Sequence, residues 1–304
     1  MHIRPVDLPE LRADIVRQRD AIGPAGIASL HTEQNLARVA PGLSSIDIAA
    51  RETTKIVMAD LFHVSESMTQ LAIASAATLP PFASDALDYP SAIGFMFFDG
   101  GIPVSWGKMP CRVHAASWQL LGTGAMVAFF LDMQSVLSEM NSTDAARQLR
   151  ELGASPNGLW YNDVVRLYAG FNAGVSDHEA GQLRQESGLS SAALPVLRAA
   201  MLLMQQPLAA LSVVEPDRAA TKRLRRAGQE PKPVRVIELR RPKRAEGTGD
   251  GSREYHHSWI VRGHWRQHWY PVRQVHRPLW IAPHIKGPED APLIGGEKVY
   301  ALKR

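Results

Sequence analysis

The strongest constraint on the fold is a two-residue alternation within residues 255–286, YHHSWIVRGHWRQHWYPVRQVHRPLWIAPHIK. One side of the alternation carries Trp259, Val261, Gly263, Trp265 and Trp269, and the other carries Ile260, Arg262, His264, Arg266 and His268. This period is typical of a strand with one buried and one solvated face. As a helix, the same residues would scatter charged and apolar groups around the axis. We therefore predict a strand here and a second one over residues 276–286.

Pairing of the two strands through a turn near residues 271–274 would gather basic and aromatic groups on one sheet face. Arg and Lys neutralise phosphates, and an indole or an imidazole ring can stack on a base. The expected face carries Arg262, His264, Arg266, His268, His276, Trp280, His284 and Lys286, and a basic groove would continue it through Arg240, Arg241, Lys243 and Arg244.

Net charge is distributed unevenly along the chain. Residues 215–304 contain 20 Lys and Arg against 10 Asp and Glu, a net charge of +10, whereas the remainder has 14 against 20, a net charge of −6. A basic third joined to an acidic two-thirds indicates that the C-terminal part meets a polyanion. The alternative is that the two parts attract each other within one fold.

The same face contains the residue types needed for metal-free RNA cleavage. Histidine can act as base and acid near neutral pH, and Arg or Lys can stabilise the phosphorane. His264 and His268 are about 13 Å apart along one strand, whereas cross-strand partners are about 4.5–5.5 Å apart. A catalytic pair would therefore combine His264 or His268 with His276 or His284. Binding without cleavage stays open as the alternative.

The spacing of the histidines does not predict a metal site or another cofactor. An HxxxH pair needs a helix to bring both rings to one metal, and the alternation favours a strand. Cys111 is the only cysteine, so the chain can form no internal disulfide and no Cys-based zinc finger. The N-terminal residues do not resemble a signal peptide. The longest apolar run, residues 125–131, is shorter than the roughly 20 residues of a membrane span, so we expect no membrane partner and a cytoplasmic protein.

Periodicity and turn residues predict an α+β protein. Residues 1–215 form an acidic helical region with an embedded antiparallel sheet, residues 216–233 a basic linker, and residues 234–304 a basic antiparallel β region. Asp99, Gly100 and Gly101 predict a hairpin turn, and the apolar run after Gly124 predicts a central strand. The helices are expected over residues 9–22, 45–62, 65–78, 144–152, 158–171 and 190–206.

The string VRGHWRQHWYP…HRPLWIAPHIKGP resembles the C-terminal part of uncharacterised proteins carried by actinobacteria, their phages and mobile elements. The resemblance covers about the last 70 residues and transfers no functional residue. A mobile-element context implies work on nucleic acid or growth inhibition. The sequence therefore predicts a protein that binds RNA or single-stranded DNA. The alternative is a partner-binding regulatory or structural protein of a phage or mobile element with no nucleic-acid activity. The N-terminal region is a candidate for binding a protein partner in either case.

Overall fold

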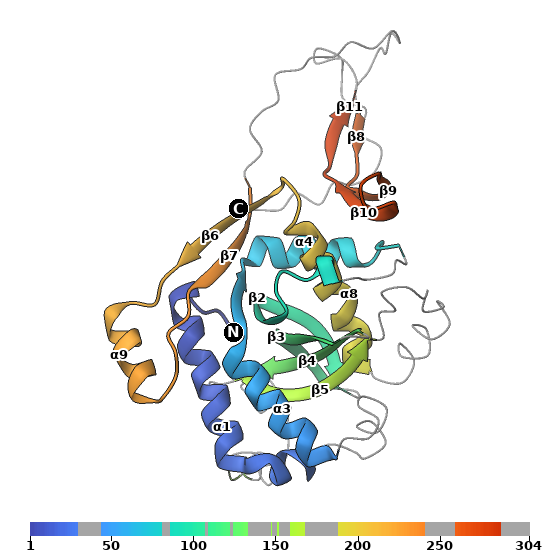
Figure 1. Cartoon of the computed structure of the whole chain (residues 1–304). Helices are drawn as coiled ribbons and strands as arrows, with labels where there is room; N and C mark the ends of the chain where they lie inside the picture. The colour runs from blue at the N-terminus through green and yellow to red at the C-terminus, as the bar shows by residue number, and fades with distance from the viewer. Residues whose placement is uncertain are drawn as a thin grey trace.

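A mixed seven-stranded sheet forms the centre of this computed structural model (Figure 1). The structure describes residues 1–29, 44–80, 86–106, 109–121, 124–132, 147, 151, 159–167, 188–240 and 259–286. The strand order is β5-β4-β3-β2-β1-β7-β6. β1 runs parallel to both β2 and β7, and the other neighbours are antiparallel. The strands are β1 (Asp60–Val64), β2 (Ile93–Trp106), β3 (Met109–Leu121), β4 (Gly124–Asp132), β5 (Leu159–Leu167), β6 (Ala209–Val214) and β7 (Val234–Leu239).

Helices cover both faces of the sheet, so the predicted α+β class is confirmed. One face packs against α1 (Leu8–Ser29) and α3 (Ser45–Met58), and the other against α4 (Glu66–Ala76) and α8 (Gly188–Leu203). The basic helix α9 (Arg218–Arg226) lies outside these layers (Figure 1). Two single-turn helices, η1 (Pro5–Asp7) and η2 (Ala86–Asp88), are also present.

Caps and breakers explain where the first helices begin and bend. Ser44 accepts a hydrogen bond from the backbone N–H of Asp47, whose carboxylate accepts one from the Ser44 N–H, which forms a capping box. Ser65 is the N-cap of α4, at the start of the helix expected over residues 65–78, and its hydroxyl accepts a hydrogen bond from the Met68 N–H. In α1, Gly23 has φ 72° and ψ 162°, so the helix kinks where the sequence predicted its end. The helix continues beyond the kink to Ser29.

The helix expected over residues 45–62 was predicted too long. It ends at Met58, and β1 starts at Asp60. Leu61 and Phe62 are buried on opposite faces of the sheet, which is possible for neighbours in a strand. The parallel partners β2 and β7 stabilise this extended segment, and both lie far from it in sequence.

Two further predictions were wrong because pairing overrides local signals. Asp99, Gly100 and Gly101 form no hairpin turn: β2 continues through them and pairs with β3 on both sides of a register shift between Phe97 and Ile102. The helix expected over residues 158–171 is the strand β5, which pairs with β4. The prediction for β4 is confirmed, since all nine of its residues are buried.

The expected third region, residues 234–304, does not begin a separate sheet. Its first strand, β7, lies between β1 and β6 in the central sheet, and Val234 and Val236 join the core beneath α1. The expected linker contains α9 as a helical connection from β6 to β7. Among the described helices, none combines the length and apolar character needed to cross a membrane. Of the helix expected over residues 144–152, the structure describes only Arg147 and Glu151, and both are helical.

Candidate nucleic-acid interface

The C-terminal part forms two short antiparallel pairs beside the α4 and α8 layer (Figure 1). β9 (His264–Tyr270) pairs with β10 (Val275–Ile281), and β8 (Trp259–Val261) pairs with β11 (His284–Lys286). The predicted strands and the turn at residues 271–274 are therefore confirmed. Gln274 closes this turn with a left-handed φ of 48°.

Buried contacts dock the β9–β10 hairpin on the body. The Trp265 indole N–H donates to the Ser75 carbonyl at 2.8 Å, and the Trp265 and Trp280 rings pack edge to face at 5.2 Å. Arg277 forms an ion pair with Asp88 at 2.9 Å, and both side chains are buried. The hairpin is therefore held in a defined position and can present its outer side chains in a fixed arrangement.

The register of the hairpin corrects the single basic face that we expected. The loop between Tyr270 and Val275 has four residues, so even-numbered residues of β9 stand opposite odd-numbered residues of β10. The expected face needed an odd-numbered loop. Instead, His264, Arg266 and His268 share one face with Arg277, Leu279 and Ile281, whereas His276 and Trp280 share the other with Trp265, Gln267 and Trp269.

The four candidate catalytic histidines are consequently separated. His264 stands opposite Ile281, His268 opposite Arg277, His276 opposite Trp269, and His284 opposite Val261, so no two are cross-strand partners in the described register. The rings of His264 and His284 contact backbone carbonyls two residues earlier in the chain, at 3.0 and 3.1 Å. A base and an acid flanking one phosphate, as cleavage would need, are not brought together by this hairpin.

The candidate phosphate-binding residues also divide. Arg262 and Arg266 are exposed on the hairpin, and Arg240 is exposed at the end of β7. Arg241, Lys243 and Arg244 lie outside the described residues, and only the backbone of Lys286 is described. Arg266 forms no ion pair within the described part of the chain.

Trp280 is not a stacking surface, because it is only 9% exposed within the main core. The exposed aromatic ring that could stack on a base is instead that of Trp269, which is 45% exposed. The alternation had assigned Trp269 to the buried face. Its ring lies 4.9 Å from that of His276, its cross-strand partner. Trp265 and Trp280 lie at the docked end of this face, whereas Trp269 lies near the turn. The sequence signal that could have predicted the exposure of Trp269 was its position next to the predicted turn at residues 271–274.

A second basic surface lies on α9, at the far end of β6 and β7 (Figure 1). Within α9, the side chains of Ala220 and Leu224 are buried. The Arg223 guanidinium donates two hydrogen bonds to the Glu10 carboxylate of α1, at 2.5 and 3.0 Å. The helix is thereby fixed to the body. Its remaining cations, Arg218, Lys222, Arg225 and Arg226, are exposed and form no ion pair within the described residues.

The most strongly perturbed imidazoles are not in the hairpin but beneath the N-terminal segment. Phe97 lies between His63 and His114, with ring centroids at 5.5 and 5.8 Å. A nitrogen of His63 contacts the Ile3 carbonyl at 3.0 Å, and His114 contacts the Met1 amino group at 3.3 Å. Burial lowers the pKa of His63, and burial together with the Met1 ammonium group lowers the pKa of His114 to about 4. Both histidines are buried and support the N-terminal segment.

This cluster predicts a loss of stability in mild acid. The folded-state pKa of His114 lies below its unfolded value of about 6.5, so its contribution is complete above pH 6.5 and is lost as pH falls toward 4. We expect about 3 kcal/mol of the unfolding free energy to be lost through this group. Urea unfolding of the parent and of His114→Gln across this range measures it, and the variant should show a flatter dependence. A histidine NMR titration of His114 near 6.5 would contradict this.

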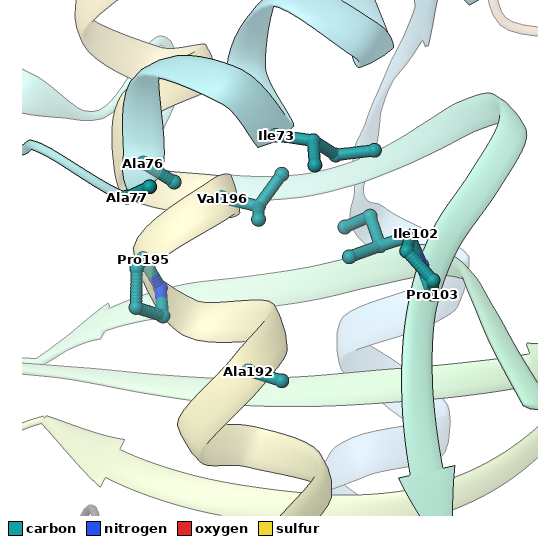
Figure 2. A pocket seen from close by; sticks show the side chains of 8 residues that line it. All are labelled: Ile73, Ala76, Ala77, Ile102, Pro103, Ala192, Pro195 and Val196. Atoms are coloured by element: carbon teal, nitrogen blue, oxygen red, sulfur yellow. The ribbon is translucent and has the colours of Figure 1, made fainter. Parts of the chain in front are cut away.

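A shallow groove of about 250 Å³ lies between α4, β2 and α8 (Figure 2). Only apolar side chains line it: Ile73, Ala76, Ala77, Ile102, Pro103, Ala192, Pro195 and Val196. It offers no group for acid–base work or for phosphate. Among the described residues, no cluster of three or more His, Cys, Asp or Glu side chains is arranged to hold a metal ion.

The fold defines an α+β protein with helices on both faces of a mixed sheet and a docked, basic, aromatic hairpin. No family model and no curated protein matches the chain. A weak structural likeness is found to the crystal structure of AcrVA2, with 11% sequence identity and a TM-score of 0.35 over 86% of this chain and 85% of that chain. A likeness at this level carries no argument about function.

Proposed function

We propose that this chain binds single-stranded nucleic acid, with RNA as the first candidate, through the outer end of the β9–β10 hairpin. The supporting observation is the half-exposed Trp269 ring, packed against His276 on a hairpin anchored by buried contacts. Aromatic rings presented in this way stack on unpaired bases, which show their faces in a single strand but not in a duplex.

Charge provides the second support. Arg266 is exposed on the opposite face of the same hairpin, between His264 and His268. A nucleic-acid strand whose base stacks on Trp269 would pass around the edge of the hairpin. Its phosphates would then lie near Arg266, His264 and His268 on the opposite face. The net charge of +10 over residues 215–304 adds long-range attraction for a polyanion. We propose binding without cleavage, since the register separates the histidines, and we place this activity in the cytoplasm.

Binding is measured by fluorescence anisotropy with labelled RNA, single-stranded DNA and duplex DNA over a series of salt concentrations. We expect tighter binding of the single strands and a linear fall of log K with log salt. Trp269→Ala should weaken single-strand binding about tenfold, since stacking on one base is worth about 1–3 kcal/mol. Arg266→Ala should reduce the salt slope by about 0.7.

Two matched variants control these results. Val272→Ala removes an exposed apolar side chain from the turn of the same hairpin, and Arg51→Ala removes an exposed cation from α3. Both should bind as the parent does. All variants stay in the full chain, because a chain ending at Val214 would lose β7 from the central sheet. Absence of binding at low salt, or equal losses for Trp269→Ala and Val272→Ala, would overturn the proposal.

A further inference from the structure

Among the described residues, the outer edge of β6 is an unpaired strand edge. β6 is the last strand in the sheet order, and no described strand pairs with its outer side. Its sequence, AALSVV, has no charge and no proline, the features with which proteins usually protect such edges. Leu211 and Val213 are exposed by 59% and 62%. An edge of this kind is a template for an additional strand.

The exposed side chains of β6 form an apolar overhang on the α4 side of the sheet. Leu211 stands opposite Ile237 and Val213 opposite Arg235 in the pairing with β7. Ile237 is buried in the core beneath α4, with its carbonyl accepting the Ser65 N–H at 2.9 Å, whereas the β6 side chains lie beyond this cover. The overhang therefore offers backbone groups and two apolar side chains spaced two residues apart.

The charge next to this edge indicates the chemistry of its partner. Glu215, Pro216 and Asp217 connect β6 to α9, and the Asp217 carboxylate is used as the N-cap of the helix. The exposed cations of α9 outnumber these two acids and form no ion pair within the described residues: Arg218, Lys222, Arg225 and Arg226. A strand that continues past the Val214 end of β6 reaches this helix (Figure 1). Acidic residues in that part of a partner would gain attraction that falls with salt.

We propose that the β6 edge and α9 together bind an extended segment of a partner protein, which adds a strand to the sheet. The segment carries alternating apolar residues against Leu211 and Val213, and acidic residues toward α9. In the antiparallel arrangement, the acidic residues precede the apolar ones in the partner's sequence.

Two other occupants fit the same surface less well. Nucleic acid would use the α9 cations but neither the strand edge nor the apolar side chains of β6. A second copy of this chain, paired antiparallel through β6, would bring its Ala209 end beside α9. Arg240 is exposed at that end, at the terminus of β7, so like charges would meet. An acidic partner strand would use the backbone edge and apolar side chains of β6, and its charges would be opposite to those of α9.

The test is selection of peptides from a random display library on the immobilised full chain, followed by anisotropy with the synthesised peptides. We expect enrichment of Asp and Glu ahead of alternating apolar residues. Leu211→Thr with Val213→Thr keeps β-forming residues at exposed positions and should weaken binding about tenfold. Replacing Lys222, Arg225 and Arg226 by Gln should weaken it by a similar factor and reduce its salt dependence. Hydrogen exchange of the β6 amides should slow when the peptide binds.

Trp269→Ala is the control that separates this proposal from nucleic-acid binding at the hairpin, and it should leave peptide affinity unchanged. Selection without acidic enrichment, or equal binding by the parent and the double Thr variant, would overturn the inference. Sedimentation that shows a dimer dispersed by the Thr substitutions would assign the edge to a second copy instead. A loss of RNA affinity in the Thr variant would assign it to nucleic acid, and either result refutes the partner strand.

Discussion

Gly94→Ala should lower the unfolding free energy by about 3 kcal/mol or more, at the upper end of the usual cost of overpacking a core. Gly94 in β2 stands directly opposite Trp118 in β3. A Cβ atom at Gly94 would lie 2.0 Å from Cζ2 of the Trp118 ring. That ring is fully buried, packs against Phe62 with centroids 5.5 Å apart, and donates its N–H to the Ser91 carbonyl at 2.9 Å. It has no space into which to move.

Urea unfolding of the full chain measures this effect, and a double variant tests its cause. Trp118→Leu removes the ring, so Gly94→Ala combined with it should cost much less than the sum of the two single changes. Gly228→Ala is the matched control: it has a positive φ of 68° but nothing within 4 Å of the added Cβ. It should cost about 1 kcal/mol, from backbone strain alone. Equal losses at Gly94 and Gly228 would show that the Trp118 ring does not cover Gly94.

Asp88→Ala should destabilise the docked hairpin by about 3–5 kcal/mol, because it leaves the Arg277 guanidinium buried without its carboxylate. The two groups are 2.9 Å apart, with side-chain exposures of 7% each. The change should first appear as faster hydrogen exchange in β9 and β10, since the hairpin can leave the body while the central sheet stays folded. Single-strand binding should weaken with it, because a mobile hairpin loses the fixed position of Trp269.

A second ion pair calibrates this result. Asp60 and Arg235 are 3.1 Å apart, but their side chains are 43% and 47% exposed, so Asp60→Ala should cost less than about 1 kcal/mol. Asp88→Leu with Arg277→Met replaces the buried pair by apolar groups and should recover much of the loss. Unchanged exchange in β9 and β10 of Asp88→Ala would show that this pair does not hold the hairpin.

In the hairpin, the alternation of residue types predicted the positions of the strands but not which residues share a face. Alternation predicted the strands, the turn at residues 271–274 and the exposure of Arg262 and Arg266, because these depend on neighbours in sequence. Which residues share a face across the strands depends on whether the loop is even or odd in length. A one-residue difference moves every side chain of one strand to the other face. The sequence therefore predicted which residue types the candidate site contains, but not how their side chains are arranged in space.

The central sheet shows the same division. The helix that begins at residue 65 and the apolar run of β4 depend on local signals, and both predictions are confirmed. β1 was predicted as the end of a helix, since a short apolar segment such as DLFHV suits either structure. Its strand conformation depends on β2 and on β7, whose register pairs Leu61 with Val234.

Local sequence patterns were thus sufficient to predict the α+β class and the strands of the hairpin, and residue composition was sufficient to show the concentration of positive charge after residue 215. The position of β7, the burial of Arg277 and Trp280, and the exposure of Trp269 and of the β6 edge required the folded chain. These features arise from pairing and docking between segments far apart in sequence. The free energy of such contacts exceeds the propensities of about 1 kcal/mol or less per residue on which sequence patterns depend.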